Sequence, residues 1–319
     1  GPVVLELRCG TEDLGPSAVP EPERRAQAEA YWSEWPAGLS LPPLKPDLMK
    51  RSALTLRGLV HADSGSIMAA ATTSLPEEIG GVRNWDYRYC WLRDAALTAS
   101  ALVSLGSTSE AEAYLGWVHD VLATVPGPER LHPLYTLWGQ TLPPEAVIDV
   151  LPGYAGSRPV RVGNAANQQV QLDVFGPIVD LIHTLAATRT AAGVTDPAVA
   201  LPDRDWELVR AMVDAVERRW AEPDHGIWEI RGNPRHHVYS KVMCWLTVDR
   251  ALTLAETYGR EAQLGWTTLR DVIAQQVREQ GWNDEAQSYT AAYDGTDLDA
   301  ATLHIGLSGL IEPDDPRFQ

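Results

Sequence analysis

Apolar residues recur at helical spacing along most of the chain, in segments that alternate in character. Three segments are apolar nearly all round, which predicts helices buried on every side. They begin after Asp94, at Gln168 and at Val238. Each precedes an amphipathic segment, at 107–125, 203–220 and 261–280, and a further apolar helix is expected at 300–310. No strand alternates with these helices, so the pattern predicts an all-α fold, an α/α toroid with an inner ring of helices shielded by an outer one.

The N-terminal residues show a different pattern. The run at 3–8 (Val-Val-Leu-Glu-Leu-Arg) resembles a single strand, which is not stable alone and is therefore expected to end a β-domain. Residues 10–20 are rich in Gly, Pro and Ser and are expected to form a linker. Helices are expected over 20–35 and from Asp47 to near His61. The expected domains are 1–19, a last strand plus linker, and 20–319, the helical domain.

The connections that precede the apolar helices are long and rich in Pro and Gly. They are the loop around Asn84 and the loops at 153–167, 223–237 and 281–296. Loops of this length in a compact domain commonly carry function. Because each leads into an inner helix, all four are expected to open on the same rim of the toroid.

The first of these loops, Asn84 to Asp94, reads Asn-Trp-Asp-Tyr-Arg-Tyr-Cys-Trp-Leu-Arg-Asp. Asp94 suits the start of a helix, where a carboxylate caps free N–H groups and meets the positive end of the dipole. Arg93 opposes that dipole. Rings, a guanidinium and a carboxylate together predict a site for a polar ligand with flat faces, such as a sugar. The alternative is a buried loop whose rings are core and whose Arg and Asp pair with each other.

Glu229 is the candidate proton donor. It follows Trp228 directly and lies between Ile227 and Ile230. A carboxyl group against an indole and aliphatic side chains loses hydration, which raises its pKa. A raised pKa lets a carboxylic acid protonate a glycosidic oxygen near neutral pH. The alternative is an exposed glutamate paired with Arg231.

An inverting glycosidase also needs a second carboxylate, which activates water from about 6.5–9.5 Å away. The rim loops offer four acids without singling one out: Asp86, Asp284, Asp297 and Asp299.

Composition narrows the choice of ligand. The net charge of −17 disfavours nucleic acid and anionic membrane surfaces, whereas a neutral substrate is compatible. No apolar run approaches the ~18 residues of a membrane span. The three cysteines form no CxxC pair and are expected to be reduced thiols in a cytoplasmic protein. No nucleotide-binding or metal motif occurs, so neither a cofactor nor a metal is expected. Five of the 12 tryptophans lie in loops, where they fit ligand walls: Trp85, Trp91, Trp138, Trp228 and Trp282.

Several motifs occur together in one order. They are the 84–94 run, Ser157-Arg-Pro-Val-Arg-Val-Gly-Asn164, Gly226-Ile-Trp-Glu229 with Ser240-Lys-Val-Met-Cys-Trp245, and Asp297-Leu-Asp299. In this combination the chain, from about residue 20 to its end, resembles glycoside hydrolase family 15, which includes glucoamylases, glucodextranases and bacterial trehalases. The resemblance implies an N-terminal β-sandwich, a barrel of six helical hairpins, and inverting hydrolysis that releases terminal α-linked glucose from trehalose or from malto- and isomalto-oligosaccharides.

The resemblance also implies roles for individual residues. Glu229 would be the general acid, and Arg93 and Asp94 would hold the hydroxyls of the terminal glucose. Tyr87 and Trp91 would be ring platforms. Three further residues would line the site: Trp228, Arg158 and Arg231.

Two positions depart from the family pattern. Ile230 stands where fungal glucoamylases have a second glutamate, and Gly156 stands where they have a tryptophan. Both changes fall on the side that receives the second sugar, so the bacterial, trehalase-like branch fits better.

The resemblance further implies that the barrel is incomplete and that the remaining helices and the general base lie beyond Gln319. An open toroid exposes apolar helix faces, so a partner is expected, either a second copy or the remainder of a longer chain. A non-catalytic sugar-binding or assembly protein is the alternative function. Another toroid enzyme, such as a lyase or terpene cyclase, is less supported because the rim loops lack clustered acidic metal motifs and a Lys or Tyr base.

Overall fold

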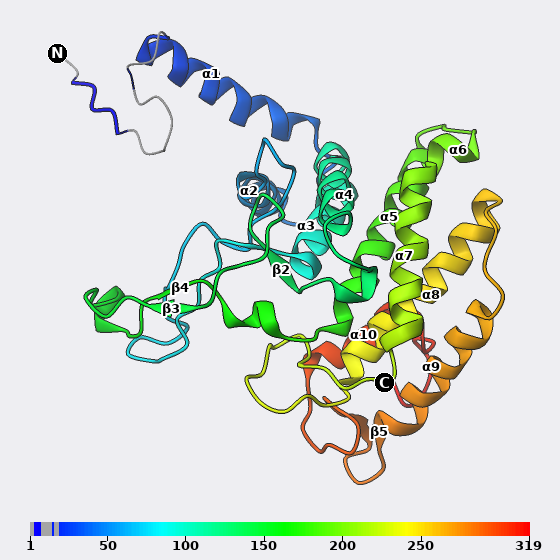
Figure 1. The fold of residues 1–319 in the computed structure, drawn as a ribbon. Coiled ribbons are helices and arrows are strands. Elements are labelled where there is room, and N and C mark those ends of the chain that lie inside the picture. Colours follow the sequence, from blue (N-terminus) through cyan, green and yellow to red (C-terminus); the bar gives the residue numbers. More distant parts are fainter. Residues whose placement is uncertain (1–2, 8–14, 16–18) are drawn as a thin grey trace.

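The computed structural model describes residues 3–7, 15 and 19–319. The two expected N-terminal helices are present as α1 (Glu21–Glu34) and α2 (Pro46–Gly58). Helix α1 buries no side chain and extends away from the remaining helices (Figure 1). The strand expected at 3–8 is not formed over its described part. Residues 3–7 are exposed and pair with no described strand, while Arg8 lies outside the described residues. The division into domains at residue 19 stays a prediction.

Three helical hairpins form the main body. Their first members are α3 (Leu92–Ser104), α5 (Phe175–Ala191) and α8 (Val238–Tyr258), and their second members are α4 (Ser109–Leu122), α7 (Asp203–Arg219) and α9 (Trp266–Gln280). Helices α3, α5 and α8 pack against one another in succession, and α4, α7 and α9 each cover the helix that precedes them (Figure 1). The expected two layers of paired helices are confirmed.

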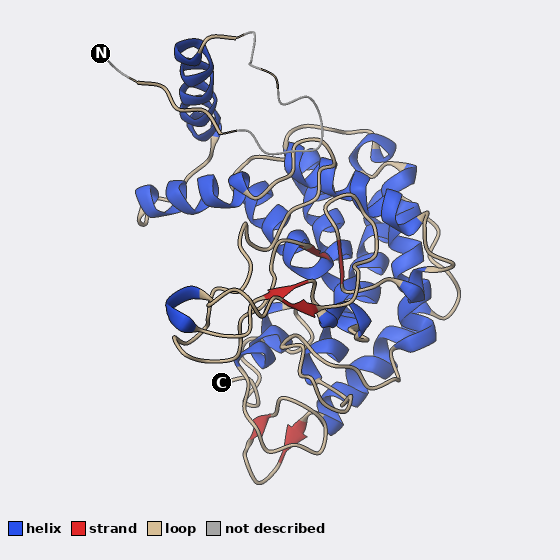
Figure 2. Ribbon diagram, turned by 60° about the vertical axis from the view of Figure 1, so that its left-hand side comes forward, coloured by secondary structure: helices blue, strands red, loops and turns tan. Residues whose placement is uncertain are grey.

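The remaining elements are short and lie in the connections between these helices (Figure 2). Three antiparallel pairs of strands join β1 (Cys90–Trp91) to β2 (Leu134–Tyr135), β3 (Ala146–Val147) to β4 (Arg161–Val162), and β5 (Trp282–Asn283) to β6 (Ser288–Tyr289). The short helices are α6 (Pro197–Ala200), α10 (His304–Leu307) and the 3₁₀ turns Trp35–Gly38, Pro128–Arg130, Tyr154–Gly156, Ala165–Gln168, Leu172–Val174 and Ala300–Leu303.

The core lies between the inner helices. Helix α8 has no exposed residue over 238–248, as its continuous apolar pattern predicts. Gly176 allows α5 to approach it closely, because a Cβ there would lie 2.8 Å from the carbonyl oxygen of Met243. Among the described helices, none combines the length and apolar character that a membrane crossing requires.

Helix α3 differs from its prediction in two ways. It begins at Leu92 and no side chain caps it, so Asp94 lies within the first turn, where its charge still suits the helix dipole. It is also not buried on every side. Asp94, Leu97, Ala101 and Ser104 form an exposed stripe, because no described helix covers that face. The partner expected for such a face stays a prediction.

The apolar helix expected at 300–310 is shorter than its pattern. It divides into a 3₁₀ turn at Ala300–Leu303 and α10, which ends at Leu307. Gly309, with a φ of 88°, cannot continue an α-helix.

Candidate functional site

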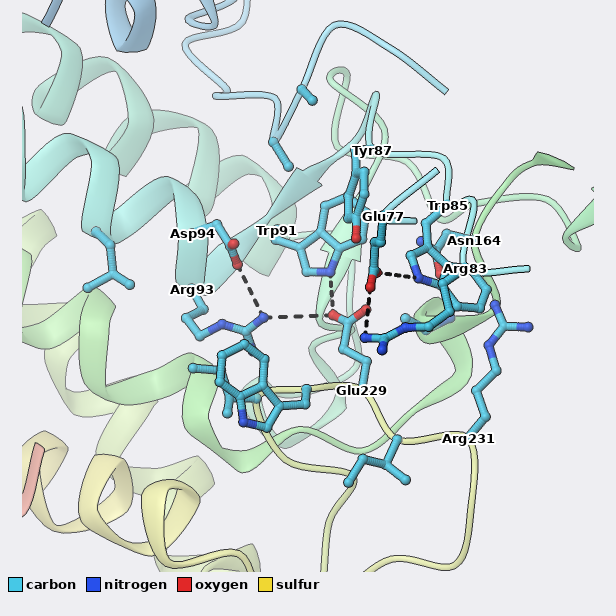
Figure 3. A pocket seen from close by; sticks show the side chains of 17 residues that line it. Glu77, Arg83, Trp85, Tyr87, Trp91, Arg93, Asp94, Asn164, Glu229 and Arg231 are labelled. Atoms are coloured by element: carbon cyan, nitrogen blue, oxygen red, sulfur yellow. Dashed lines mark hydrogen bonds and ion pairs between the residues drawn. The ribbon is translucent and has the colours of Figure 1, made fainter. Parts of the chain in front are cut away.

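A cavity of about 1010 Å³ opens beside the N-terminal end of α3 (Figure 3). Three segments far apart in sequence line it, at 69–97, 164–166 and 227–231. Three of the four long loops therefore meet at one site, as expected. The fourth, at 281–296, contributes no residue to the cavity.

Most of the predicted site residues lie together. Seven of them line the cavity: Tyr87, Trp91, Arg93, Asp94, Trp228, Glu229 and Arg231. Arg158 does not line it and is exposed. The neighbouring Ser157 is buried, and its hydroxyl group accepts a hydrogen bond from the Gly80 N–H at 2.9 Å. This bond holds the loop that contains Arg158 against the segment around Gly80, while the Arg158 side chain stays at the surface.

Arg93 is buried within a group of acidic side chains. Its Nη1 donates to Asp173 Oδ2 at 2.9 Å and to Gln171 Oε1 at 3.1 Å, and its Nη2 lies 3.2 Å from Asp94 Oδ2. Burial by itself would lower the pKa of Arg93, but the nearby carboxylates outweigh it and raise the pKa. Arg93 and Asp94 do pair with each other, as the alternative of a buried loop predicts. Both side chains nevertheless line the cavity, as the prediction of a ligand site requires.

Glu229 lies in the cavity wall with its carboxyl group largely enclosed. Its Oε1 accepts hydrogen bonds from Trp91 Nε1 at 2.5 Å and Gln171 Nε2 at 3.2 Å, and lies 3.7 Å from Arg93 Nη2 (Figure 3). Burial raises the pKa of Glu229, and the Arg93 charge and the two hydrogen bonds offset part of that effect. The raised pKa agrees with the prediction from the sequence, but the indole that donates a hydrogen bond to the carboxyl group is that of Trp91, whereas Trp228 donates to Asp299.

Trp228 and Arg231 line the same cavity as Glu229 but hydrogen-bond to other carboxylates. The Trp228 side chain is 64% exposed, and its Nε1 donates to Asp299 Oδ2 at 2.6 Å. Arg231 donates to both carboxylate oxygens of Glu145, at 3.1 and 2.6 Å. The alternative of an exposed Glu229 paired with Arg231 is therefore wrong, because Arg231 forms its ion pair with Glu145.

The outer wall of the cavity contains the Trp85 ring, over which the guanidinium groups of two arginines lie. The guanidinium carbons of Arg161 and Arg231 lie 4.5 and 4.2 Å from the Trp85 ring centroid, within cation–π range. Glu145 accepts hydrogen bonds from both arginines. The Trp85 indole donates to Glu77, which also pairs with Arg83 at 2.8 Å (Figure 3). This wall therefore presents a flat ring and charged groups to the cavity.

None of the four acids considered as a second carboxylate lines the cavity. Asp86 is buried, and although burial raises its pKa, the hydrogen bonds from Arg88 and Gly163 N–H bring it below the ordinary value. The other three also lie outside the cavity and are paired with cationic or indole donors: Asp284 with Trp282, Asp297 with Arg235, and Asp299 with Trp228.

The sequence argument missed the segment 169–173, which lies against Glu229 and Arg93. Gln169, Gln171 and Asp173 alternate along it, the spacing that places side chains on one side of an extended chain. A helix was expected from Gln168, and this hid the alternation. The α-helix begins only at Phe175.

Asp224 was also missed and lies beneath this segment. Its Oδ2 accepts hydrogen bonds from Leu172 N–H at 3.0 Å and Ser240 Oγ at 2.7 Å. Burial and the Asp173 carboxylate raise the pKa of Asp224 to about 7. Within residues 19–319, the Oδ1 atoms of both aspartates are buried and have no hydrogen-bond partner.

Other predicted features lie away from the cavity. Trp138 packs against His61 and Trp282 against Tyr289, so these two loop tryptophans do not form a ligand wall. Cys90 and Cys244 are buried free thiols, and Cys9 lies outside the described residues. No group of three or more His, Cys, Asp or Glu side chains in the described part of the chain is arranged to hold a metal ion.

Comparison with known proteins supplies the family. The model of glycosyl hydrolases family 15 matches residues 44–319, and a trehalase-like N-terminal model matches residues 1–32. The trehalase of Thermoplasma volcanium is 36% identical over 296 residues, covering 92% of this chain and 45% of the relative. The trehalase of Mycobacterium tuberculosis is 39% identical over 275 residues, covering 85% of this chain and 39% of the relative. The chain thus spans less than half the length of either relative.

Solved structures share the fold. A bacterial glucoamylase complexed with acarbose superposes with a TM-score of 0.64 at 13% identity, over 92% of this chain and 42% of the glucoamylase. A glycosidase variant in complex with glucose superposes with a TM-score of 0.60 at 19% identity, over 85% of this chain and 66% of the glycosidase. These similarities confirm the α/α toroid arrangement of the paired helices. With the family model matching most of its length, the chain belongs to glycosyl hydrolases family 15.

Proposed function

We propose that the cavity binds the terminal glucose of a neutral α-glucoside, with trehalose preferred, and that Glu229 donates the proton in an inverting hydrolysis that releases glucose. The observation that carries this proposal is the position of Glu229. Its carboxyl group lies in the cavity wall beside the Arg93–Asp94 pair, and burial raises its pKa. The preference for trehalose rests on the two relatives named trehalase.

The cavity offers the groups that a glucose unit requires. The Tyr87 and Trp91 rings, with centroids 5.8 Å apart, present apolar faces to the C–H face of a sugar. The Asp94 carboxylate is exposed and can accept hydrogen bonds from sugar hydroxyls, while the neighbouring Arg93 fixes its position.

In the proposed step, the Glu229 proton moves to the glycosidic oxygen. The bond from C1 to that oxygen breaks, and its electron pair leaves with the oxygen. Water then attacks C1 from the opposite face, and a second carboxylate in contact with that water takes its proton; the two carboxyl groups of an inverting enzyme lie about 6.5–9.5 Å apart.

A sugar-binding role without hydrolysis is the second candidate. The other two acids that line the cavity are already paired, Glu77 with Arg83 and Asp94 with Arg93. Neither is an unpaired base, and this favours binding alone for the residues described.

The two candidates differ in glucose release. Trehalose, maltose, isomaltose and starch are incubated with the protein, and the product anomer is followed by NMR. Hydrolysis with inversion predicts that the glucose unit attacked by water is released as the β-anomer, so that trehalose gives β- and α-glucose in equal amounts at first, and Glu229→Gln is expected to lower the rate by about 100- to 10,000-fold. The control Glu285→Gln changes an exposed loop glutamate away from the cavity. Full activity of Glu229→Gln would refute the role of the acid. Trehalose binding by calorimetry without glucose release would support the second candidate.

A further inference from the structure

The side-chain amide of Gln171 connects the two central charged groups of the cavity. Gln171 is 5% exposed. Its Oε1 accepts a hydrogen bond from Arg93 Nη1 at 3.1 Å, and its Nε2 donates to Glu229 Oε1 at 3.2 Å and to Gln169 Oε1 at 3.1 Å. Gln169 in turn donates to the backbone oxygen of Glu229 at 3.0 Å. Two glutamines of one extended segment therefore hold both the main chain and the carboxyl group of Glu229.

The orientation of this amide is fixed by chemistry. A guanidinium has only donors, so the amide atom that faces Arg93 must be the oxygen, and the NH₂ group must then face Glu229. The Trp91 indole nitrogen is likewise a donor only. Every hydrogen bond that the described residues make to the Glu229 carboxyl group reaches Oε1. Among the described residues, no hydrogen bond reaches the other oxygen, Oε2, whereas Trp91 and Gln171 both donate to Oε1.

This arrangement decides where the acid proton is located. A proton on Oε1 would face an indole N–H and an amide N–H, neither of which can accept it. A proton on Oε2 faces no donor from the described residues. We propose that Gln171 is a positioning residue that, together with Trp91, keeps the acid proton of Glu229 on Oε2, the oxygen available to the glycosidic oxygen. This inference rests on the proposed role of Glu229 as the acid.

Gln171 also affects the ionisation of Glu229. Arg93 and Asp94 from α3 and Tyr87 from the preceding loop are the charged and titratable groups that face this carboxyl group. Gln171 is neutral, and its donated hydrogen bond favours the ionised carboxylate, which lowers the pKa of Glu229. Removing that donor is expected to raise the pKa and to let the proton occupy either oxygen.

The test compares Gln171→Leu and Gln171→Met with the control Gln275→Leu. Gln275 also donates to a carboxylate, that of Glu279 at 2.8 Å, but on the exposed face of α9. The titration of Glu229 is followed by infrared difference spectroscopy, comparing each protein with its counterpart that also carries Glu229→Gln, and kcat and kcat/KM for trehalose are measured across pH.

Both Gln171 variants are expected to titrate at a higher pH by about one pH unit, and kcat on the acidic plateau is expected to fall about tenfold. The control is expected to change neither. If Gln171→Leu fails to fold, as judged by thermal melting, the same two measurements on Gln171→Met, whose side chain is unbranched, decide whether the inference holds. A fall in kcat without a shift in the titration would reduce Gln171 to a structural role and overturn the inference, as would unchanged behaviour. Absence of glucose release by the unmodified chain would count against the proposed function alone, because the infrared titration needs no turnover.

Discussion

The indole Nε1 of Trp91 donates a 2.5 Å hydrogen bond to Oε1 of Glu229, across 138 residues of sequence. Trp91 is buried and lies in β1, directly before α3. Glu229 reaches the same part of the cavity wall from a distant loop, in which its own φ is 55°. One side chain thus serves both as a proposed platform for the sugar ring and as a donor to the proposed acid.

Trp91→Phe tests this double role, because it keeps a ring and removes the donor. In the unmodified protein the hydrogen bond from Trp91 stabilises the charged carboxylate of Glu229. Removing this donor therefore raises the pKa of Glu229 further. A general acid must be protonated to act, so the alkaline limb of the kcat/KM profile is expected to move to higher pH. Trp138→Phe, which changes an exposed loop tryptophan outside the cavity, is the control. A shift to lower pH would contradict the assignment.

Asp173→Asn tests the support of Arg93. Arg93 keeps a hydrogen-bond acceptor but loses one of its negative neighbours. The free energy of unfolding is expected to fall by about 2 kcal/mol, and trehalose affinity is expected to fall about tenfold because the guanidinium is held less firmly. Urea denaturation and calorimetry measure the two effects. Asp271→Asn removes the exposed partner of Arg270 and should cost less than about 1 kcal/mol. Equal effects of the two variants would disprove the buried role.

Asp224 predicts a pH dependence of stability. An unfolded aspartate titrates near pH 3.8, whereas burial and Asp173 raise the pKa of Asp224 in the folded protein to about 7. The folded state therefore binds this proton more tightly. Its contribution to stability is fully present below about pH 4 and is lost as the pH rises to about 7.

Asp224→Asn cannot ionise and keeps an acceptor for Leu172 N–H and Ser240 Oγ. Its free energy of unfolding, relative to the unmodified protein, is expected to rise between about pH 4 and pH 7, by at most about 4 kcal/mol, and then to level off. Urea denaturation at several pH values measures the difference. A difference that stays constant with pH would show that Asp224 is ionised throughout.

Glu145→Gln tests the outer wall of the cavity. Glu145 forms ion pairs with Arg161 and Arg231, and the guanidinium groups of both lie over the Trp85 ring. The side chains are partly exposed, so the loss of stability is expected to be only about 1 kcal/mol. Trehalose binding is expected to weaken several-fold, while the titration of Glu229 stays unchanged. Glu279→Gln on α9 is the matched control. An altered Glu229 titration in Glu145→Gln would show that the two walls are coupled.

The helices could be predicted closely from the sequence, because burial imposes a local periodicity. The pattern at 238–258 coincides with α8, and that at 203–220 with α7, since each residue's environment follows its position on the helix. The motifs around Arg93 and Glu229 likewise indicated the cavity and the family.

The partners within the site could not be predicted in the same way. Proximity in sequence favoured Trp228 as the indole beside the Glu229 carboxyl group and Arg231 as its ion-pair partner. In the structure the indole is that of Trp91 and the nearby cation is Arg93. The alternation of polar residues at 169–173 carried a signal for Gln171, and the expectation of a helix there concealed it.

The sequence by itself determined the inner and outer helices, the family and seven of the residues that line the cavity, because apolar periodicity and contiguous motifs are local properties of the chain. Only the tertiary structure decided which groups meet. Arg231 pairs with Glu145 across 86 residues and Arg93 with Asp173 across 80. Such contacts arise when loops from separate helices pack at one end of the fold, and the low exposure there makes each buried charge depend on the partner that packing provides.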